Sequence, residues 1–427
     1  MGAIAAKFGG SSLADAGHFE KVRAIVEADD RRRYIIPSAP GKRYARDRKV
    51  TDLLYACYEN AGEKETFDPL FDRIEKRYRE IIADLKLDFD IGPMLKEVRR
   101  DIRAGASADY TASRGEYLNG LIMAAYLGYD FVDPAEMIFF DGEGRYDHER
   151  SSRAVAQRLA QHERAVIPGF YGSDPEGHIK TFTRGGSDIT GAIVAGAIAA
   201  QLYENWTDVD GFLMADPAIV SDPKPIDYIT YKELRELSYM GAKVLHEDAI
   251  FPVKQAGISI NIRNTDNPGV PGTMIVGDDE TIPQTGRITG VAGKKNFTVI
   301  GIEKALMNSQ IGFARKLLSI VERHHISFEH MPSGIDSVSL VVSDAELAGK
   351  TDAVLDDIEK ELQPDIIYMN PQLSLIATVG LGMARTPGMA SRLFSSLAEA
   401  GINVRMIDQG SSELNIIIGG ENEEYER

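Results

Sequence analysis

Apolar positions in the first 280 residues fall into short runs, with amphipathic stretches between several of them. The runs of strand length are residues 4–8, 34–36, 129–132, 137–140, 165–167 and 258–262. Helical patterns cover residues 19–28, 52–60 and 116–126. Because strand and helix patterns alternate, we expect an α/β domain with a largely parallel sheet and helices on both of its faces.

Glycine and proline residues gather near the end of this region. The hexapeptide NPGVPG at residues 267–272 is followed by Ile282 and Pro283. Such punctuation is typical of a domain boundary, because these residues interrupt helices and strands. We therefore predict a first domain over residues 1–285.

The chain beyond this boundary repeats itself at an offset of 76 residues, which relates Gly312 to Gly388. The same offset pairs Val299 with Leu375, Ile326 with Ile402, Met331 with Ile407, Gly334 with Gly410 and Leu340 with Ile416, without a gap. Two unrelated α/β segments would not keep this register through both helix and strands. We therefore predict tandem copies of one β-α-β unit that bury each other's sheet edges or helix faces.

We place the two copies at residues 290–365 and 366–427. The first copy continues with a predicted helix at residues 352–362, and its counterpart would extend past Arg427. The last helix of the second copy is therefore expected to be short, or the sequence to be truncated. Strands can also be exchanged between two such units.

The balance of charges excludes several classes of partner. Lys and Arg number 48 against 65 Asp and Glu, a formal net charge of −17. Nucleic acids and anionic membranes need a basic surface, so neither is expected as a partner. The most apolar long stretch, residues 189–203, is shorter than the ~20 residues of a membrane span. The single cysteine, Cys57, cannot form an internal disulfide, which fits a reducing cytoplasm.

A lysine and two glycines stand where a predicted strand gives way to a helix, in the sequence KFGGSS at residues 7–12. Glycines let a ligand approach the backbone, and the start of a helix offers free N–H groups. Lys7 can approach phosphate oxygens as a point charge. The motif is not a Walker A sequence. From these residues alone, a tight turn and a phosphate-binding loop both remain open.

A second loop of this kind, TRGGSD at residues 183–188, precedes another apolar helix. Arg184 offers the fork that binds a carboxylate, and Asp188 can orient a lysine or accept from an ammonium group. Two glycine-rich loops that each lead into a helix of one α/β domain can hold two anionic groups face to face. Phosphoryl transfer requires this arrangement.

Three other features leave alternatives open or point away from chemistry. Glu116, in the first turn of a predicted helix, can favour the helix dipole or bind a substrate ammonium. The basic run within residues 41–49 can be a solvated loop or can capture anions. His324, His325 and His330 have no Cys or Glu at ligand spacing, so we expect no metal site built from protein side chains.

Six motifs occur in an order that is characteristic of one family. They are KFGGSS (7–12), TDLL (51–54), SRGE (113–116), RGGSD (184–188), WTDVDG (206–211) and GAKVLH (241–246). In these motifs, over nearly its whole length, the chain resembles the aspartate kinases (aspartokinases). The tandem repeat resembles their pair of ACT regulatory domains. The chain is too short to include the homoserine dehydrogenase of some relatives, so a monofunctional enzyme is expected.

The resemblance implies transfer of the ATP γ-phosphate to the β-carboxylate of L-aspartate, giving 4-phospho-L-aspartate on the route to lysine, threonine, methionine and isoleucine. It implies the amino-acid kinase fold, an α/β/α sandwich with an eight-stranded, mainly parallel sheet. Two ferredoxin-like ACT domains of βαββαβ order would follow. Mg²⁺ would be carried on the ATP phosphates. The protein would be a cytoplasmic homodimer paired through its ACT domains.

The resemblance also implies roles for residues that match the family motifs. Lys7 and Asp188 would be catalytic, with Asp188 organising the lysine. Aspartate would be held by Ser38, Thr51, Glu116, Arg184 and Ser187, where Glu116 takes its ammonium group and Arg184 one carboxylate. The nucleotide would be bound by Lys7, Gly9, Gly10, Ser11, Thr207, Asp208 and Lys243.

Lysine, threonine or both are implied as feedback effectors at an interface between ACT units. The implied positions are Met307, Gly312, Phe313, Ala314, Ser327, Phe328, Glu329, Asn403, Gln409, Ser411, Ser412 and Asn415. A free amino acid needs a site for its carboxylate and one for its ammonium group, and Glu329 can supply the second. We hypothesise lysine as the main effector; plain packing repeats are the alternative.

Two positions depart from the family pattern. Leu213 and Ala218 stand where many relatives have Tyr and Arg, which usually help to hold the nucleotide. We expect activity to survive this loss. Two other functions remain as alternatives: an amino-acid kinase acting on glutamate or acetylglutamate, and an inactive sensor that binds amino acids without turnover.

Overall fold

The computed structural model describes residues 2–183, 185–242, 245, 247–278, 288–383, 386–409 and 414–427, without the side chains of residues 247–250. Within this described part, the chain divides into two compact units. The N-terminal unit comprises Met1–Phe212, Pro225–Tyr231 and Val244–Glu280. The C-terminal unit comprises Leu213–Lys224, Lys232–Lys243 and Thr281–Arg427, so it includes two segments from within the first predicted domain. The three domain ranges given above stay predictions.

The N-terminal unit is built on a sheet that, in the described residues, has eight strands in the order β3-β4-β2-β1-β7-β9-β10-β8. The strands are β1 (Ile4–Phe8), β2 (Arg32–Pro37), β3 (Asp130–Phe131), β4 (Ala165–Val166), β7 (Leu202–Thr207), β8 (Tyr228–Thr230), β9 (Ile260–Asn264) and β10 (Thr273–Val276). Neighbouring strands pair in parallel, whereas β9 and β10 are antiparallel. The predicted mainly parallel sheet is confirmed.

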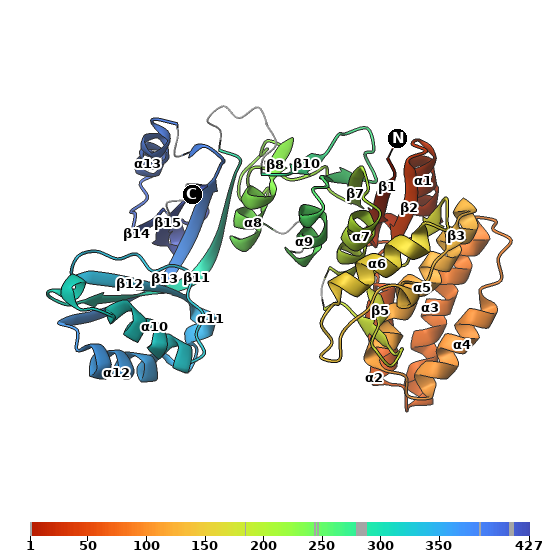
Figure 1. The fold of residues 1–427 in the computed structure, drawn as a ribbon, viewed down its shortest axis with the longest axis horizontal. Helices are drawn as coiled ribbons and strands as arrows, with labels where there is room; N and C mark the ends of the chain where they lie inside the picture. The colour runs from red at the N-terminus through yellow and green to blue at the C-terminus, as the bar shows by residue number, and fades with distance from the viewer. Residues whose placement is uncertain are drawn as a thin grey trace. The chain divides into compact units, whose positions relative to one another are not determined.

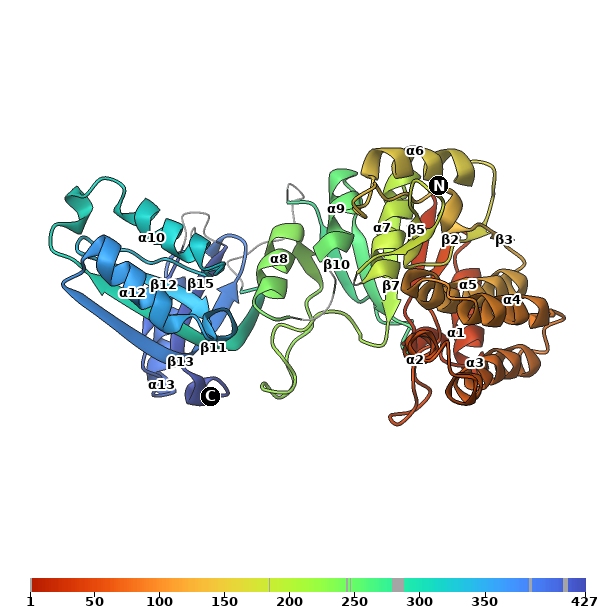
Figure 2. The same ribbon diagram turned by 90° about the horizontal axis from the view of Figure 1, so that it is seen from below.

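Helices cover both faces of this sheet (Figures 1 and 2). On one face lie α1 (Ala16–Glu27), α2 (Val50–Glu59), α3 (Lys64–Asp84), α4 (Gly92–Arg103) and α5 (Ala108–Leu127), which form one core with Phe8, Ile35 and Trp206. On the other face, α7 (Gly186–Ala197) contacts β1, β2 and β7, and α6 (His148–Leu159) and α9 (Glu247–Gln255) contact α7. The α/β/α sandwich implied by the resemblance is thereby confirmed.

Smaller elements complete the N-terminal unit. These are the 3-10 turns η1 (Ser11–Leu13) and η2 (Pro134–Glu136) and the antiparallel hairpin of β5 (Tyr171–Ser173) and β6 (Ile179–Thr181). The strand predicted at residues 137–140 is wrong, because this segment makes isolated bridges through Phe139 and Phe140. Met137 and Ile138 are fully buried. Their apolar run therefore reflects burial and not a strand ladder.

In the described residues, the C-terminal unit has one five-stranded antiparallel sheet in the order β12-β11-β13-β15-β14. Its strands are β11 (Gly290–Glu303), β12 (Ser337–Ser343), β13 (Ile366–Val379), β14 (Met406–Asp408) and β15 (Asn415–Glu421). Its helices are α8 (Tyr231–Tyr239), α10 (Phe313–Arg323), α11 (Asp344–Leu347), α12 (Thr351–Leu362) and α13 (Met389–Glu399), and its 3-10 turns are η3 (Met307–Ser309) and η5 (Asn422–Glu424). The first residue of α8, Tyr231, is also the last residue of a segment of the N-terminal unit.

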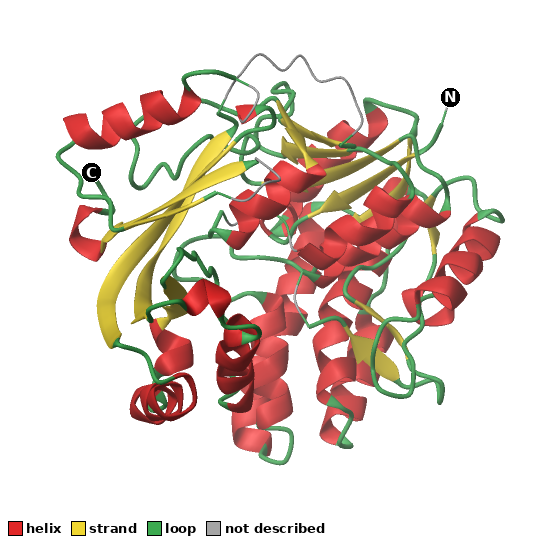
Figure 3. Ribbon diagram, turned by 60° about the vertical axis from the view of Figure 1, so that its left-hand side comes forward, coloured by secondary structure: helices red, strands yellow, loops and turns green. Residues whose placement is uncertain are grey.

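Two long strands join the repeat copies (Figure 3). The second half of β11 pairs with the first half of β13, from Val299–Asn370 to Glu303–Ile366. The first half of β11 pairs with the second half of β13, from Gly290–Val379 to Lys294–Leu375, and β15 lies on the other side of that half. The start of β11 therefore completes the sheet of the second copy. This sharing covers strand edges that would otherwise expose unpaired N–H and C=O groups.

Two further sequence observations have structural counterparts. Cys57 is fully buried in α2, and burial raises the pKa of its thiol to about 12, so the thiol stays protonated. Across the described parts of the chain, no helix combines the length and the apolarity that crossing a membrane would require.

Candidate active site

The structure brings Lys7, Asp188 and Asn205 together at the carboxyl ends of β1 and β7. Lys7 Nζ lies 2.6 Å from Asp188 Oδ1 and donates to Asn205 Oδ1 at 3.3 Å. Asn205 Nδ2 donates to the same Asp188 oxygen at 2.9 Å. The lysine and aspartate side chains are only 10% and 19% exposed, so little water competes for either charge. We call these three residues the lysine cluster.

Local geometry explains why this cluster forms. Lys7 and Asn205 are register partners in the parallel pair of β1 and β7, so their side chains leave the sheet on the same face. That face is covered by α7, whose first turn carries Asp188. The residue before this helix, Gly185, has a φ of +59°, a conformation that glycine adopts without strain.

The loop after β1 is held close to its neighbours. The backbone N–H of Gly9 donates to the carbonyl of Trp206, and the N–H of Gly41 donates to the carbonyl of Gly10 at 2.7 Å. A Cβ at Gly10 would lie 2.8 Å from the Ala39 carbonyl oxygen, and one at Gly41 would lie 2.6 Å from Gly10 backbone atoms. Glycine is therefore required at both positions for the two backbones to touch.

A buried ion pair clamps the loop that carries Gly41. Arg77 of α3 donates to Asp47 Oδ2 at 2.5 Å and to the carbonyl oxygens of Gly41 and Ala14. Both charged side chains are 4% exposed. Arg43 also donates to Asp47, and these contacts hold the pKa of this carboxyl far below its usual range. Arg43 is therefore paired to carboxylates, which favours a structural role for this part of the basic run over capture of anions.

Glu116 of α5 is a buried carboxyl group beneath the loop after β2. The backbone N–H of Ala39 hydrogen-bonds to it, while its Oε2 atom has no hydrogen-bond partner. Burial raises the pKa of Glu116 to about 8. On the same helix, Asn119 Nδ2 donates to the carbonyl of Ser38 at 2.7 Å. The prediction that Glu116 stands in the first turn of a helix is wrong, because α5 begins at Ala108 and the helix-dipole role therefore falls away. An unpartnered carboxylate oxygen is costly to bury, which gives this acid the character of a ligand-binding group.

The other predicted site residues surround the same strand ends where the structure describes them. Ser38 follows β2 and donates its backbone N–H to Phe8, and Ser187 packs so closely on Gly169 that a Cβ there would lie 2.5 Å from Ser187 Oγ. Thr51 is in the first turn of α2, and Ser11 begins η1. Thr207 ends β7 and donates its hydroxyl to the exposed Asp208. Arg184 and Lys243 lie outside the described residues.

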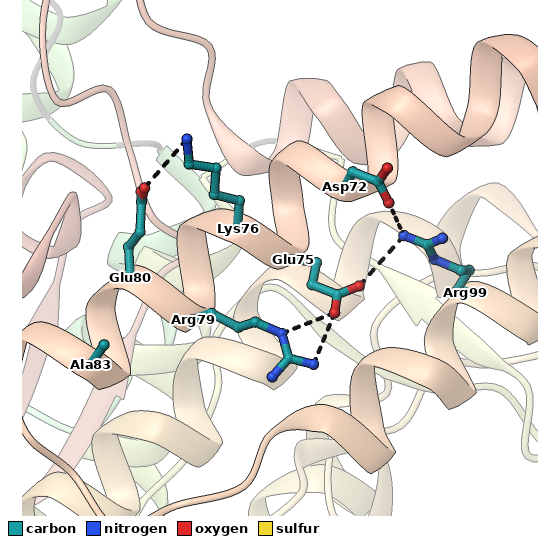
Figure 4. A pocket seen from close by; sticks show the side chains of 7 residues that line it. All are labelled: Asp72, Glu75, Lys76, Arg79, Glu80, Ala83 and Arg99. Carbon is teal, nitrogen blue, oxygen red and sulfur yellow. Dashed lines mark hydrogen bonds and ion pairs between the residues drawn. The ribbon is translucent and has the colours of Figure 1, made fainter.

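A surface pocket of about 610 Å³ lies elsewhere, on α3 and α4 (Figure 4). Its charged side chains pair with one another: Lys76 with Glu80, Arg79 with Glu75, and Arg99 with Asp72 and Glu75. None of the predicted site residues lines it. We interpret it as a solvated charged groove.

Carboxylates and a histidine also come together in the β5–β6 hairpin. Ligand atoms of Asp174, Glu176 and His178 lie within 4.8 Å of one another, the one such group found in the described residues. Asp174 accepts from the backbone N–H groups of Glu176 and His178, as in an ordinary turn. Exposed turns of this kind are common without a bound ion.

The predicted effector residues lie at the start of α10 and along the neighbouring strand edges. Met307 and Phe313 are buried, Gly312 precedes α10 with a φ of +84°, and Ala314 and Phe328 are exposed. Ser327 donates its N–H to Glu346. Asn403 and Gln409 are exposed on either side of β14. Ser411 and Ser412 lie outside the described residues.

Three contacts link this region to α8 and to the second repeat copy. They involve Glu329, Asn415 and His330, which is next to Glu329 in the chain. Partial burial and the interaction of its hydroxyl with the Glu329 carboxylate raise the pKa of the half-exposed Tyr239 of α8 to about 12. Asn415 Nδ2 donates to Glu236 at 2.5 Å. His330, next to Glu329, pairs with Asp408 of β14 at 2.7 Å. The two repeat copies thus meet beside Glu329.

Sequence reasoning missed Asn205, Asn119, Arg77 and Asp47. For Asn205 a signal was available, since Glu204 and Asn205 are polar residues inside a strand that is otherwise buried. For Arg77 and Asp47 there was none, because 30 residues separate the two halves of the ion pair.

Comparison with known proteins places the chain in a family. The amino acid kinase family model matches residues 3–264, and an ACT domain model matches residues 376–427. Aspartokinase 3 of Bacillus subtilis is 38% identical over 97% of this chain and 94% of the relative. The chain belongs to the aspartokinases of the amino acid kinase family. It is therefore an enzyme that phosphorylates aspartate with ATP, under allosteric regulation through its ACT region.

Solved aspartokinases have the same fold. The structure of Clostridium acetobutylicum aspartate kinase superposes with a TM-score of 0.90 at 55% identity, covering 100% of this chain and 98% of that one. E. coli aspartokinase III, solved with aspartate and ADP, gives a TM-score of 0.72 at 25% identity, covering 99% and 97%. The departures from the family pattern, Leu213 and Ala218, are both exposed in a segment that groups with the C-terminal unit.

The contact between Gly10 and Gly41 leads to a stability prediction. A Gly41→Ala change would place a methyl group against the Gly10 backbone, which has no flexible side chain to move aside. We expect the free energy of unfolding of the N-terminal unit to decrease by about 1–3 kcal/mol. Urea unfolding followed by the fluorescence of Trp206, the single tryptophan, measures this. Gly62→Ala is the control, because nothing lies within 4 Å of its Cβ; equal stability of the two variants would contradict the prediction.

Proposed function

We propose that the lysine cluster is the phosphoryl-transfer centre for the β-carboxylate of L-aspartate. The observation that carries this proposal is the contact of a largely buried Lys7 ammonium with Asp188 and Asn205, beside the loop of Gly9 and Gly10. The product is 4-phospho-L-aspartate, the precursor for lysine, threonine, methionine and isoleucine.

Phosphoryl transfer to a carboxylate requires charge neutralisation more than acid–base catalysis. The attacking carboxylate is already ionised at pH 7, so it needs no general base. It must approach a phosphate chain of the same sign, and fixed positive charge in a site with little water reduces that repulsion most. Lys7 supplies the charge on the transferring phosphate, the loop of Gly9 and Gly10 lets that phosphate come close to the backbone, and Asp188 orients the lysine.

Aspartate lies between the ends of β2, α5 and α7. Ser38, Thr51, Arg184 and Ser187 hold its carboxylates, and Glu116 takes its ammonium group. The unpartnered Oε2 of Glu116 supports this role, because an ammonium donor would satisfy it. The complex of E. coli aspartokinase III with aspartate and ADP supports this pairing of substrates.

The nucleotide enters as its magnesium complex. Asp188, the carboxylate of the lysine cluster, is already paired with the Lys7 ammonium. Mg²⁺ held by the ATP phosphates therefore fits this site better than Mg²⁺ held by protein ligands alone. Bound Mg²⁺ supplies charge neutralisation on the phosphate chain. Ser11, Thr207, Asp208 and Lys243 hold the nucleotide, and other contacts replace those lost at Leu213 and Ala218.

Lysine is the effector, bound at the ACT positions named above. The E. coli relative solved with lysine and aspartate supports this assignment. Glu329 receives the ammonium group of lysine, and the turn before α10 receives its carboxylate. The exposed Leu306, Ile311 and Ile335 in the first ACT unit support pairing of two chains through ACT domains. We infer a cytoplasmic homodimer.

The first test is activity with and without the Lys7 ammonium. Wild-type protein with MgATP and aspartate is expected to form an acyl phosphate that hydroxylamine traps as a hydroxamate, and glutamate is expected to give none. Lys7→Met is expected to lower kcat on the order of 10³-fold, because a positioned charge on the transition state is lost. Lys21→Met, at a half-exposed ion pair with Asp266, is the control and should keep kcat. Full activity of Lys7→Met would refute the proposed centre.

Glu116 predicts a pH dependence for aspartate alone. With a pKa of about 8, Glu116 is protonated in the empty site at neutral pH, and binding of an ammonium group requires the carboxylate. The kcat/KM for aspartate should therefore rise with pH, by up to about tenfold per unit, and level off above about pH 8. Glu116→Gln should lower it and remove the slope, while kcat/KM for ATP keeps its profile. An unchanged slope in Glu116→Gln would assign the titration to another group.

Tyr239 predicts how strongly lysine inhibits. Its hydroxyl interacts with the Glu329 carboxylate, so the ammonium group of bound lysine competes with it for that carboxylate. Tyr239→Phe removes the competitor, and we expect half-maximal inhibition at roughly three- to tenfold less lysine, given the usual net strength of a protein hydrogen bond. Tyr425→Phe is the control, because its hydroxyl donates to Gly293 in the same unit. Calorimetry that detects binding of threonine and none of lysine would reverse the effector assignment.

A further inference from the structure

We propose that Asn205 is a positioning residue that holds Lys7 and Asp188 in their catalytic arrangement through the two ends of its amide. The proposal rests on the roles assigned above to Lys7 and Asp188. It assigns a third member to the site that none of the motifs in the sequence includes.

The hydrogen bonds orient this amide in one way. An ammonium group can only donate and a carboxylate can only accept. The amide oxygen must therefore face Lys7, at 3.3 Å, and the amide nitrogen must face Asp188, at 2.9 Å. Asn205 is 4% exposed, so water does not replace either bond readily.

A neutral acceptor is suited to this place. A second carboxylate beside Lys7 would neutralise its charge and compete with the phosphate for it. The amide oxygen instead restrains the ammonium without adding negative charge. Its nitrogen at the same time donates to the Asp188 oxygen that binds Lys7, which keeps that oxygen between the lysine and the amide.

Few other groups around Asn205 could hold the Lys7 ammonium and the Asp188 carboxylate in place. From β1 the facing charge is Lys7, and from α7 it is Asp188. On β7 itself, Tyr203 points the same way and donates its hydroxyl to the backbone carbonyl of Asp188 at 3.0 Å. The register partner on β9 is the apolar Ile262. Tyr203 therefore fixes the backbone of the first turn of α7, and Asn205 fixes its carboxylate.

The test compares two substitutions that keep the size of the side chain. Asn205→Leu removes both hydrogen bonds, and we expect kcat to fall roughly tenfold to hundredfold, with KM for ATP and for aspartate within about threefold of wild type. Tyr34→Phe is the control from the same sheet, because its hydroxyl donates to the backbone carbonyls of Leu159 and His162, outside the site, and its kcat should stay within about threefold. Thermal unfolding and Trp206 fluorescence report whether each variant is folded.

Asn205→Asp provides a readout that a purely structural role would not change. The introduced carboxyl can accept from Lys7 in either form, but it can donate to Asp188 only when protonated. Burial and the charge of Asp188 favour the protonated form and the Lys7 ammonium favours the ionised one, so the introduced carboxyl gains its proton, and with it the bond to Asp188, as the pH falls. The ratio of kcat for Asn205→Asp to that of wild type should therefore increase at least about fivefold from pH 8 to pH 6.

The outcomes separate the inference from the function on which it rests. Retention of kcat in Asn205→Leu, an equal loss in Tyr34→Phe, a loss expressed mainly in KM, or a ratio for Asn205→Asp that is constant with pH would each overturn the positioning role. If Asn205→Leu does not fold, the pH ratio of Asn205→Asp decides. Full activity of Lys7→Met would instead overturn the proposed centre itself, whatever Asn205 does.

Discussion

A lysine ammonium that has lost most of its water is the constraint on which the catalytic unit depends. Removing a charge from water costs several kcal/mol unless a counter-charge and hydrogen bonds replace the hydration. For Lys7 the replacements come from α7 and β7, through Asp188 and Asn205. The order β2-β1-β7, the parallel register of Lys7 with Asn205 and the start of α7 must therefore all be right together. The glycine contacts between the loops after β1 and β2 depend on the same arrangement, because both strands end at this edge of the sheet.

The regulatory unit is organised by a different constraint, the edge of a sheet. Each repeat copy alone would leave backbone groups unpaired, and the 14-residue strands β11 and β13 remove this problem by serving both copies. The two copies consequently share one sheet and cannot shift independently. Helix α8 is held against the second copy, since Glu233 accepts from Thr289 and from the backbone N–H of Leu381, and Glu236 accepts from Asn415. Because α8 directly follows β8, a covalent path runs from the effector region to the catalytic sheet.

Predictability differs between residues according to how locally their roles are set. Lys7, Gly9, Gly10 and Asp188 could be singled out because a glycine-rich turn between strand and helix is a local pattern. The 76-residue repeat was equally readable, since it needs only register along the chain. The role of Asn205 could not be predicted, because the function of a polar residue inside a strand depends on neighbours that are distant in the sequence. Residues 137–140 were misread for a related reason, as burial and strand pairing produce the same apolar run.

The sequence by itself determined the alternation of strands and helices, the tandem regulatory units and the family, because these depend on periodicity and on motifs of adjacent residues. The tertiary structure alone decided which distant groups meet. It brought Arg77 to Asp47 and Tyr239 to Glu329, and it placed residues 213–224 and 232–243 with the regulatory unit. It also showed that Glu116 is buried with an oxygen left unpartnered. The physical reason is that burial, desolvation and pairing of charges are properties of three-dimensional neighbourhoods, which spacing along a chain does not specify.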